Sequence, residues 1–332
     1  MKELIQKLTE TFSPSGYEST IRDVIRAEVE SLVDDLRVDA LGSLIAHKKP
    51  SGKGPAKRIM IAAHMDEIGI IATHIDDNGF VRFTGVGGVY PRNLPGGRVR
   101  FISGTPGVIG LEPTEKPGEI QPLEKCYIDV GAKTSKNHPI KIGDVAGFER
   151  SFLDMGERLV AKSMDDRIGC AVAIEALRAL KSTPHDVYVV FTTQEEVGTR
   201  GAETSAYGID PDLGFSIDVT AWGDTPNQKD FKMDLGKGPA IKIKDGGMLS
   251  DPRIVHWMIR TAEKAKLPYQ REVLLGGTTD ARAMQLVRAG VPVGCVSIPC
   301  RYVHSPSEMV DYNDVQNAVK LIAALLSNPF DL

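Results

Sequence analysis

Cysteine is scarce in this sequence of 332 residues, and no two cysteines form a CxxC pair. Four thiols without a pairing pattern argue against a disulfide framework. We therefore expect buried free thiols at Cys126, Cys170, Cys295 and Cys300.

Long apolar runs are absent as well. No segment reaches the roughly 18 consecutive apolar residues of a membrane helix. The first segment, MKELIQKLTETF, alternates charged residues with Leu and Ile at helical spacing, so it lacks the apolar run of a secretory signal. These absences predict a cytoplasmic protein that does not enter a membrane.

An excess of one charge is the third absence. The formal net charge is -4, and the main basic cluster, at 47–58, is typical of a solvated loop. A nucleic-acid partner is therefore not expected. The hydrophobic fraction of 42% is that of an ordinary globular protein. At roughly 150 residues per domain, the length predicts two domains.

The composition changes twice along the chain. Residues 68–162 contain closely spaced Gly and Pro with short β-prone runs between them, which predicts a small inserted all-β domain, expected to be a barrel. On both sides, in 1–67 and 163–332, strand and helix patterns alternate. This alternation predicts one discontinuous α/β domain, with a mainly parallel or mixed sheet covered by helices on both faces.

Polar residues follow several of the predicted strands of the α/β domain, where open α/β sheets bind their ligands. These residues, together with an Asp pair at a helix start, are His64, Asp66, Asp165, Asp166, Glu195, Glu196, Asp218 and His304. Each has an ordinary alternative, such as a strand-end histidine, a helix N-cap or a surface ion pair. Taken together, however, they would crowd like charges into one cleft, which divalent cations would neutralise.

Two histidines and three carboxylates suit two zinc-class ions that share one carboxylate. Adjacent strand residues point to opposite sides, so one of Glu195 and Glu196 is expected to bind an ion and the other to act as general base. The residues alone do not decide which glutamate is the base, nor which of Asp165 and Asp166 is a ligand. Asp66 shares a strand face with His64 and is expected to orient its imidazole.

Five ordered motifs resemble those of the tetrahedral aminopeptidases, in the glutamyl aminopeptidase-like family of dinuclear metallopeptidases. The motifs are AHMDEIG (63–69), KSMDDRIGC (162–170), TQEEVGTRGA (193–202), SIDVT (216–220) and RYVHSPSE (301–308). Ordered motifs over nearly the whole chain are far more specific than any single one. The insertion lies where this family has its dimerisation domain.

The resemblance implies a role for each site residue. It places one ion on His64, Asp165 and Asp218, and the other on Asp165, Glu196 and His304. It makes Glu195 the general base and implies a cis peptide bond between Asp165 and Asp166.

The family often reads GGGTDA near its substrate cleft, whereas this chain has Thr278 at the third glycine. Gly277 and Thr278 are candidates for substrate contacts or for support of the ligands. A turn followed by a helix N-cap explains them about as well. The GVGGVYP segment at 85–91 is typical of a turn.

The resemblance implies a metal-dependent aminopeptidase that removes N-terminal residues from short peptides, with two zinc or cobalt ions per subunit. It also implies homo-oligomers, with dimers assembling into a tetrahedral dodecamer. Two alternatives are a metal-dependent deacylase or amidohydrolase acting on N-blocked substrates and a non-catalytic self-assembling protein. Acidic, basic and aliphatic first residues are all compatible with the sequence.

Overall fold

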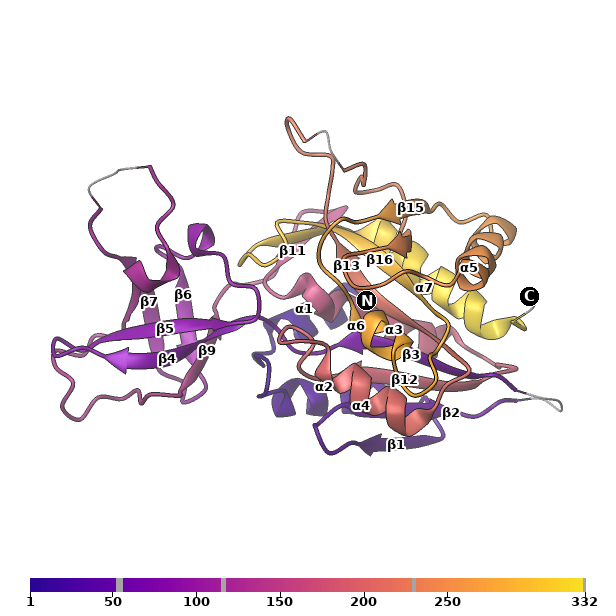
Figure 1. Cartoon of the computed structure of the whole chain (residues 1–332), viewed down its shortest axis with the longest axis horizontal. Helices are drawn as coiled ribbons and strands as arrows, with labels where there is room; N and C mark the ends of the chain where they lie inside the picture. The colour runs from indigo at the N-terminus through magenta and orange to yellow at the C-terminus, as the bar shows by residue number, and fades with distance from the viewer. Residues whose placement is uncertain (52–55, 115–117, 229–230, 331–332) are drawn as a thin grey trace.

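The computed structural model describes residues 1–51, 56–114, 118–228 and 231–330. Residues 52–55 of the basic cluster at 47–58 and residues 115–117 of the predicted insertion at 68–162 lie outside this description. Figure 1 shows a large α/β body with a smaller β domain standing off one side of it.

The α/β body is built on one large mixed sheet. In spatial order its strands are β1 (Asp35–Val38), β2 (Leu44–Lys48), β12 (Asp186–Thr192), β3 (Arg58–His64), β13 (Leu213–Thr220), β16 (Val293–Arg301), β17 (Glu308–Asp311), β11 (Arg158–Ala161) and β10 (Leu153–Asp154). A side branch consists of β14 (Ala240–Lys244), which pairs with β16, and β15 (Gln270–Val273), which pairs with β14. The four neighbouring strands β12, β3, β13 and β16 run parallel to one another. Parallel central strands are buried on both faces, and β13 is accordingly buried along its whole length.

Helices cover both faces of this sheet, as the sequence predicts. They are α1 (Lys2–Glu10), α2 (Ser19–Val29), α3 (Met164–Ala179), α4 (Arg200–Ile209), α5 (Pro252–Lys264), α6 (Asp280–Gln285) and α7 (Tyr312–Ser327). Apolar residues of α1, α2, α3, α5 and α7 join the larger core on one face. Residues of α4 and α6 join a separate core on the other face. The predicted fold class is confirmed.

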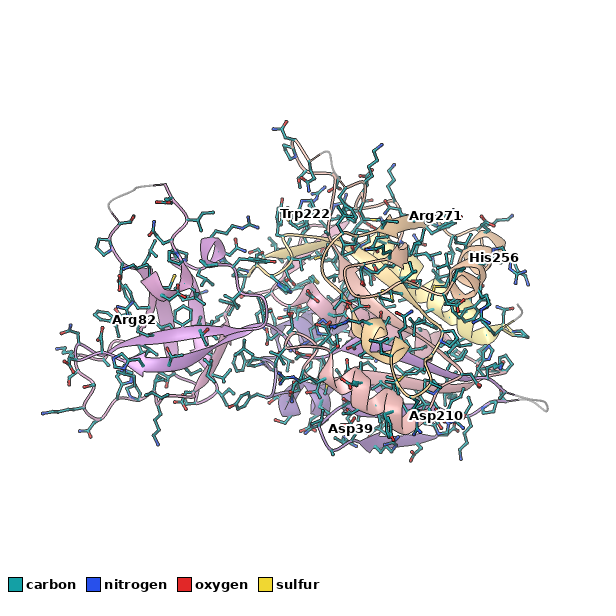
Figure 2. All side chains as sticks on the ribbon, viewed as in Figure 1. Asp39, Arg82, Asp210, Trp222, His256 and Arg271 are labelled. Atoms are coloured by element: carbon teal, nitrogen blue, oxygen red, sulfur yellow. The ribbon has the colours of Figure 1, made fainter. Side chains whose placement is uncertain are left out.

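The β domain is a closed barrel. Its strands, in order around the barrel, are β4 (Gly69–Ile75), β5 (Phe80–Val86), β8 (Cys126–Asp129), β7 (Pro106–Leu111), β6 (Arg98–Phe101) and β9 (Val145–Phe148). Short 3₁₀ turns are η1 (Pro91–Asn93) and η2 (Leu123–Lys125). The barrel has its own apolar core, which includes Phe101, Ile109 and Ile128. In Figure 2, Arg82 marks the barrel and Asp210 marks the end of α4 in the α/β body.

Two short strands of segment 68–162 do not belong to the barrel. β10 and β11 form a hairpin, and β11 pairs with β17 at the margin of the large sheet. The barrel strands therefore end at Phe148, and the chain is back in the α/β body by Leu153. The sequence pattern could not separate these strands, because a short β-prone run looks alike in a barrel and at a sheet edge.

Among the described residues, no helix has the length and apolarity that crossing a membrane requires. All four cysteines are free and buried, as expected from the sequence.

Candidate metal centre

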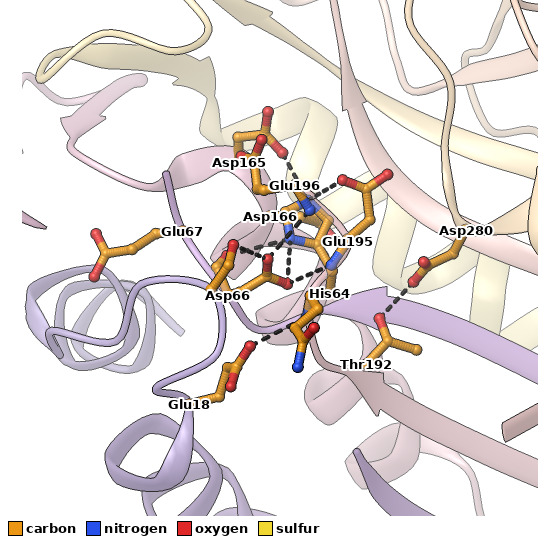
Figure 3. A network of polar contacts seen from close by, with 12 residues as sticks. Glu18, His64, Asp66, Glu67, Asp165, Asp166, Thr192, Glu195, Glu196 and Asp280 are labelled. Carbon is orange, nitrogen blue, oxygen red and sulfur yellow. Dashed lines mark hydrogen bonds and ion pairs between the residues drawn. The ribbon is translucent and has the colours of Figure 1, made fainter. Parts of the chain in front are cut away.

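The predicted ligand residues meet beyond the carboxyl ends of the central strands. His64 is the last residue of β3, Asp218 lies near the end of β13, and Glu195 and Glu196 follow the end of β12. Parallel strands bring their carboxyl ends to the same edge of a sheet, so chain segments far apart in sequence converge there. Figure 3 shows this network of acidic side chains around His64.

Asp165 is close to both predicted histidine ligands. Its Oδ1 lies 2.9 Å from Nε2 of His64, and its Oδ2 lies 3.3 Å from Nε2 of His304. Nε2 of His304 is also 3.3 Å from Oε2 of Glu196. The carboxylate of Asp165 thus lies between the imidazoles of the two predicted histidine ligands.

Asp166 points in a different direction from Asp165. The peptide bond between the two residues is cis, and both have non-helical backbone angles at the start of α3. Oδ1 of Asp166 accepts a hydrogen bond of 3.0 Å from the backbone N–H of Gly169. Asp166 therefore caps the start of α3, a role that the sequence left open for either Asp.

Two sets of atoms are close enough to hold metal ions. One contains His64, Asp166 and Asp218, and the other contains His64, Asp165 and Glu196; within each set the ligand atoms lie within 4.8 Å of one another. The sets implied by the resemblance differ, because they place Asp165 beside Asp218 and include His304. The choice between Asp165 and Asp166 as partner of Asp218 therefore stays a prediction.

The charges of this cluster are not balanced by the described protein groups. Burial raises the pKa of Asp218 and of Asp166 well above the usual value, and neighbouring carboxylates raise both further. Although burial would lower it, the carboxylates of Asp165 and Asp66 hold the pKa of His64 well above its ordinary range. The cluster thus has an excess of negative charge that protons or cations must offset.

Two buried carboxylate oxygens without a hydrogen-bond partner indicate that cations, and not protons alone, offset this negative charge. Oε1 of Glu196 and Oδ2 of Asp166 are buried without a hydrogen-bond partner among the described residues. A buried polar atom without a partner costs free energy, which a coordinated ion would recover. Imidazole and carboxylate are also the donors that zinc-class ions accept. The residues present therefore fit divalent metal ions.

Asp66 does more than the sequence analysis expected. Nδ1 of His64 lies 3.2 Å from the backbone carbonyl oxygen of Asp66 and 3.5 Å from its carboxylate, so the carbonyl is the nearer partner of the imidazole. The carboxylate itself accepts the backbone N–H groups of Glu195, at 3.0 Å, and Glu196, at 3.2 Å. Asp66 therefore fixes the turn that presents both glutamates.

Ser15 supports Asp66 from the turn between α1 and α2. Its hydroxyl donates a 2.5 Å hydrogen bond to Oδ2 of Asp66, and both residues are buried. In the same turn, Glu18 accepts the backbone N–H of Gln194 at 3.1 Å. The sequence analysis assigned neither residue a role, because a serine or a glutamate in a turn has no local feature that indicates a distant partner.

Replacing Ser15 with Ala is expected to slow turnover about tenfold while metal content is kept, because a hydrogen bond to a charged group contributes about 1.5–3 kcal/mol. The effect should fall on kcat rather than on KM, since Ser15 contacts Asp66, which holds the two glutamates, and does not line the cavity that opens over the cluster. Steady-state kinetics with metal analysis would check this. Ser15→Thr, which keeps the hydroxyl, is the matched control, and equal loss in both variants would contradict the role of the hydrogen bond.

Glu308 is a third residue without an assigned role, although it ends the RYVHSPSE motif. Its carboxylate accepts the backbone N–H of Asp165 at 2.9 Å and that of His304 at 2.7 Å. One buried side chain therefore links the backbones of two predicted ligands. Burial raises the pKa of Glu308 to about 8, and the charge of Asp165 adds to this shift.

A cavity of about 550 Å³ opens over the cluster. Gly277 and Thr278, the candidates from the loop before α6, line it. The barrel also reaches it, because Gly88, Tyr90 and Arg92 line the same cavity. The inserted domain therefore forms part of the wall of the candidate site.

Gly87 and Gly88 lie directly against two predicted ligands. A Cβ atom added to Gly88 would come within 2.6 Å of the imidazole Cε1 of His304. One added to Gly87 would come within 3.1 Å of Cβ of Glu196. The GVGGVYP segment, expected only to be a turn, thus requires glycine because it packs on the metal centre.

Known proteins resemble the chain over nearly its full length. A 44% identical protein of Acetivibrio thermocellus, described as a candidate aminopeptidase, aligns over 97% of both chains. The lysyl aminopeptidase of Pyrococcus furiosus is 37% identical over 98% of this chain and 96% of its own.

Solved structures agree with these relatives. An aminopeptidase of Desulfurococcus kamchatkensis is 43% identical, covers 98% of this chain and 94% of its own, and superposes with a TM-score of 0.94. The TET1 peptidase of Pyrococcus horikoshii, described as assembling into a tetrahedron or a large octahedral shell, is 34% identical over 99% of both chains, with a TM-score of 0.89. The profile of the M42 glutamyl aminopeptidases matches residues 42–321. The chain therefore belongs to the M42 glutamyl aminopeptidase family, whose members are enzymes that hydrolyse peptide bonds.

Proposed function

We propose that this enzyme removes N-terminal residues from short peptides and that two divalent ions, zinc or cobalt, bind the cluster. The observation that carries the proposal is the placement of Glu195, whose Oε2 lies 3.9 Å from Nε2 of His64 at the edge of the cluster and in the wall of the cavity. A general base must lie within a water molecule's reach of the ions that activate the water, and the placement of Glu195 beside the cluster supports that role.

In this proposal the ions are held by five residues: His64, Asp165, Glu196, Asp218 and His304. Asp165 would bridge, because it lies between both histidines. When bound, such ions lower the pKa of a water molecule and stabilise negative charge on a carbonyl oxygen.

Glu195 would take the proton of the attacking water and return it to the leaving amine. Burial raises the pKa of Glu195 well above the usual value, and the nearby Asp218 and Asp280 carboxylates add to this shift, which strengthens it as a base. Asp66 would keep Glu195 in place through the backbone contact described above. Asp166 would support the start of α3 through its Oδ1 and would not be the bridging ligand.

Metal-dependent cleavage of free-amine substrates is the direct test. Aminoacyl anilides with a free terminus should be hydrolysed, chelation should abolish the rate, and zinc or cobalt should restore it. The matched controls are the same anilides with an acetylated terminus. Cleavage confined to free amines supports the aminopeptidase, cleavage of the acetylated set would indicate a deacylase, and no cleavage of either set would favour a non-catalytic assembly.

The same proposal includes assembly through the barrel into dimers and then a tetrahedral dodecamer. The similarity to the Pyrococcus horikoshii peptidase supports it, because the two chains align over 99% of their lengths, barrel included. Light scattering during size-exclusion chromatography should give about twelve times the 36.0 kDa mass of one chain. A monomer at micromolar concentration would refute the shell.

The cytoplasm is the compartment we propose for this activity. Buried free thiols, as found at all four cysteines, suit a reducing compartment.

The first residue that the enzyme prefers is not set by family membership. The family is named for glutamyl substrates, whereas the Pyrococcus furiosus relative is named for lysyl substrates.

A further inference from the structure

Glu67 is a buried acidic residue that the proposed mechanism does not use. It follows Asp66 in the chain and is only 2% exposed. Figure 3 shows its side chain turned away from the predicted metal ligands around His64. A buried carboxylate is costly unless cations and hydrogen-bond donors compensate it, so its partners indicate what it does.

Four groups from two distant chain segments surround this carboxylate. Its Oε2 accepts hydrogen bonds from Nζ of Lys162, at 2.5 Å, and from the hydroxyl of Ser163, at 2.6 Å. Its Oε1 accepts the backbone N–H of Ser13 at 2.7 Å and lies 3.5 Å from Nη2 of Arg167. Both oxygens are therefore used, and one side chain joins the two segments.

Two buried cations share this one carboxylate. Lys162 and Arg167 are both buried, and Arg167 has no exposed surface. Burial lowers the pKa of Lys162, the charge of Glu67 opposes this shift, and the charge of Arg167 adds to it. Glu67 therefore compensates two like charges that would otherwise repel each other in a buried site.

The partners of Glu67 lie on both sides of Asp165, the predicted bridging ligand. The residues at 162–163 precede it in the chain, and Arg167 follows it. The backbone N–H of Asp165 itself donates to Glu308. Two buried carboxylates thus hold this segment, and Glu67 provides the contacts that flank the ligand.

Arg167 extends the network to the end of α1 and the residues after it. Its Nη1 donates to the backbone carbonyl oxygens of Leu8, at 2.6 Å, and Thr11, at 2.8 Å. Its Nη2 donates to the carbonyl oxygen of Ser13 at 3.3 Å. The N-terminal part of the chain is thereby tied to the start of α3.

We propose that Glu67 is a positioning residue of the metal centre, which fixes the backbone on both sides of Asp165 and so places its carboxylate between the two histidines. Without the charge of Glu67, Lys162 and Arg167 would repel each other, and the segment between them would shift. A shifted bridging carboxylate would weaken the binding of both ions, because both share it. This inference rests on the proposed function, which makes Asp165 the bridge, and extends it to a residue outside the cluster.

The experiment measures zinc affinity, by competition with a chelator, and the kinetics of a free-amine anilide in Glu67→Gln. Gln has the size of Glu but lacks the charge that holds the two cations. Zinc affinity should fall about tenfold to a hundredfold, the usual effect of losing a group that orients a ligand. At saturating zinc, KM should be unchanged, because Glu67 does not line the cavity over the cluster.

A double variant separates positioning from general stability. Glu67→Gln combined with Lys162→Met removes one charge of each sign, so the network keeps its net charge and the melting temperature should recover. If Glu67 positions the ligand, zinc affinity should stay low in this variant, because the link is still missing. Recovery of zinc affinity together with the melting temperature would overturn the inference. If Glu67→Gln alone does not fold, the double variant decides by the same measurement.

Ser163→Ala is a milder variant that changes no charge. It removes one hydrogen bond to Glu67 and should lower zinc affinity in the same direction by a smaller factor. Because the other three partners of Glu67 remain, the variant should fold. Zinc affinity equal to that of the unmodified enzyme in both Ser163→Ala and the double variant would count against the positioning role.

Asp314→Asn is the matched control. Asp314 is also a fully buried carboxylate, and it accepts the backbone N–H groups of Gly236, at 2.6 Å, and Gly238, at 2.7 Å. These glycines precede β14 and are not predicted ligands. The substitution should lower the melting temperature and leave zinc affinity unchanged. An equal loss of zinc affinity in this control would show a general effect of removing a buried charge, and would refute the specific role of Glu67.

The outcomes distinguish this inference from the proposed function. If the unmodified enzyme binds no zinc or cleaves no free-amine anilide, the proposed function and this inference both fail. If the unmodified enzyme is metal-dependent and Glu67→Gln keeps its zinc affinity, the function stands and the positioning role of Glu67 is refuted.

Discussion

The Glu195→Gln enzyme is expected to bind its full complement of metal and to turn over about 10² to 10⁴ times more slowly, the usual contribution of a general base. Gln has the size of Glu but cannot take the proton of the attacking water. The backbone N–H at position 195, which donates to Asp66, is unaffected by the substitution, so the turn should keep its shape. Turnover of a free-amine anilide, measured together with metal content, checks this prediction.

Asp165→Ala provides the contrast for that result. Asp165 lies between His64 and His304, so its removal should lose metal and activity together. Asp166→Ala is the comparison variant: because Asp166 caps α3 through Gly169, its removal should reduce metal content less than the loss of Asp165 does. Unchanged turnover in Glu195→Gln would exclude Glu195 as the base, and full metal content in Asp165→Ala would exclude the bridge.

The sequence predicted the scaffold of the site because that scaffold depends on local patterns. The apolar run of β3 ends at His64 and that of β13 includes Asp218, so strand ends could be located without knowing the fold. Parallel alternation then implied that these ends meet. The resemblance implied ligand pairings that patterns cannot give; these pairings stay predictions, whereas family membership is confirmed.

The sequence could not predict contacts between distant segments made by residues of ordinary type. A serine in a turn and a glutamate near a strand end are common, and nothing local distinguishes Ser15 or Glu308. Their roles arise from their partners, which are Asp66 and the backbones of two predicted ligands. The direction in which Asp165 and Asp166 point was equally hidden, because it depends on backbone angles at a cis peptide bond.

The second large effect on activity is expected where the inserted domain contacts the metal centre, at Gly88 and His304. Gly88→Ala is expected to reduce activity by at least about a hundredfold and to weaken metal binding. The reason is the imidazole of His304, which occupies the space that the new methyl group needs. His304 is also held from behind, because its backbone N–H donates to Glu308 and its carbonyl oxygen accepts a 3.3 Å hydrogen bond from Asn93. The ring therefore has little freedom to move aside, and a displacement of about 1 Å at a catalytic centre can cost a hundredfold in rate.

Gly208→Ala is the matched control for this prediction. Gly208 lies in α4, nothing is within 4 Å of the position of an added Cβ, and alanine is a better helix former than glycine. That variant should keep full activity and metal content, with stability unchanged or slightly higher. Metal titration and steady-state kinetics on both variants would decide the matter. If Gly88→Ala kept its metal affinity and its rate, the segment that contains Gly88 must be able to move aside. The inserted domain would then have no part in holding His304 against the centre.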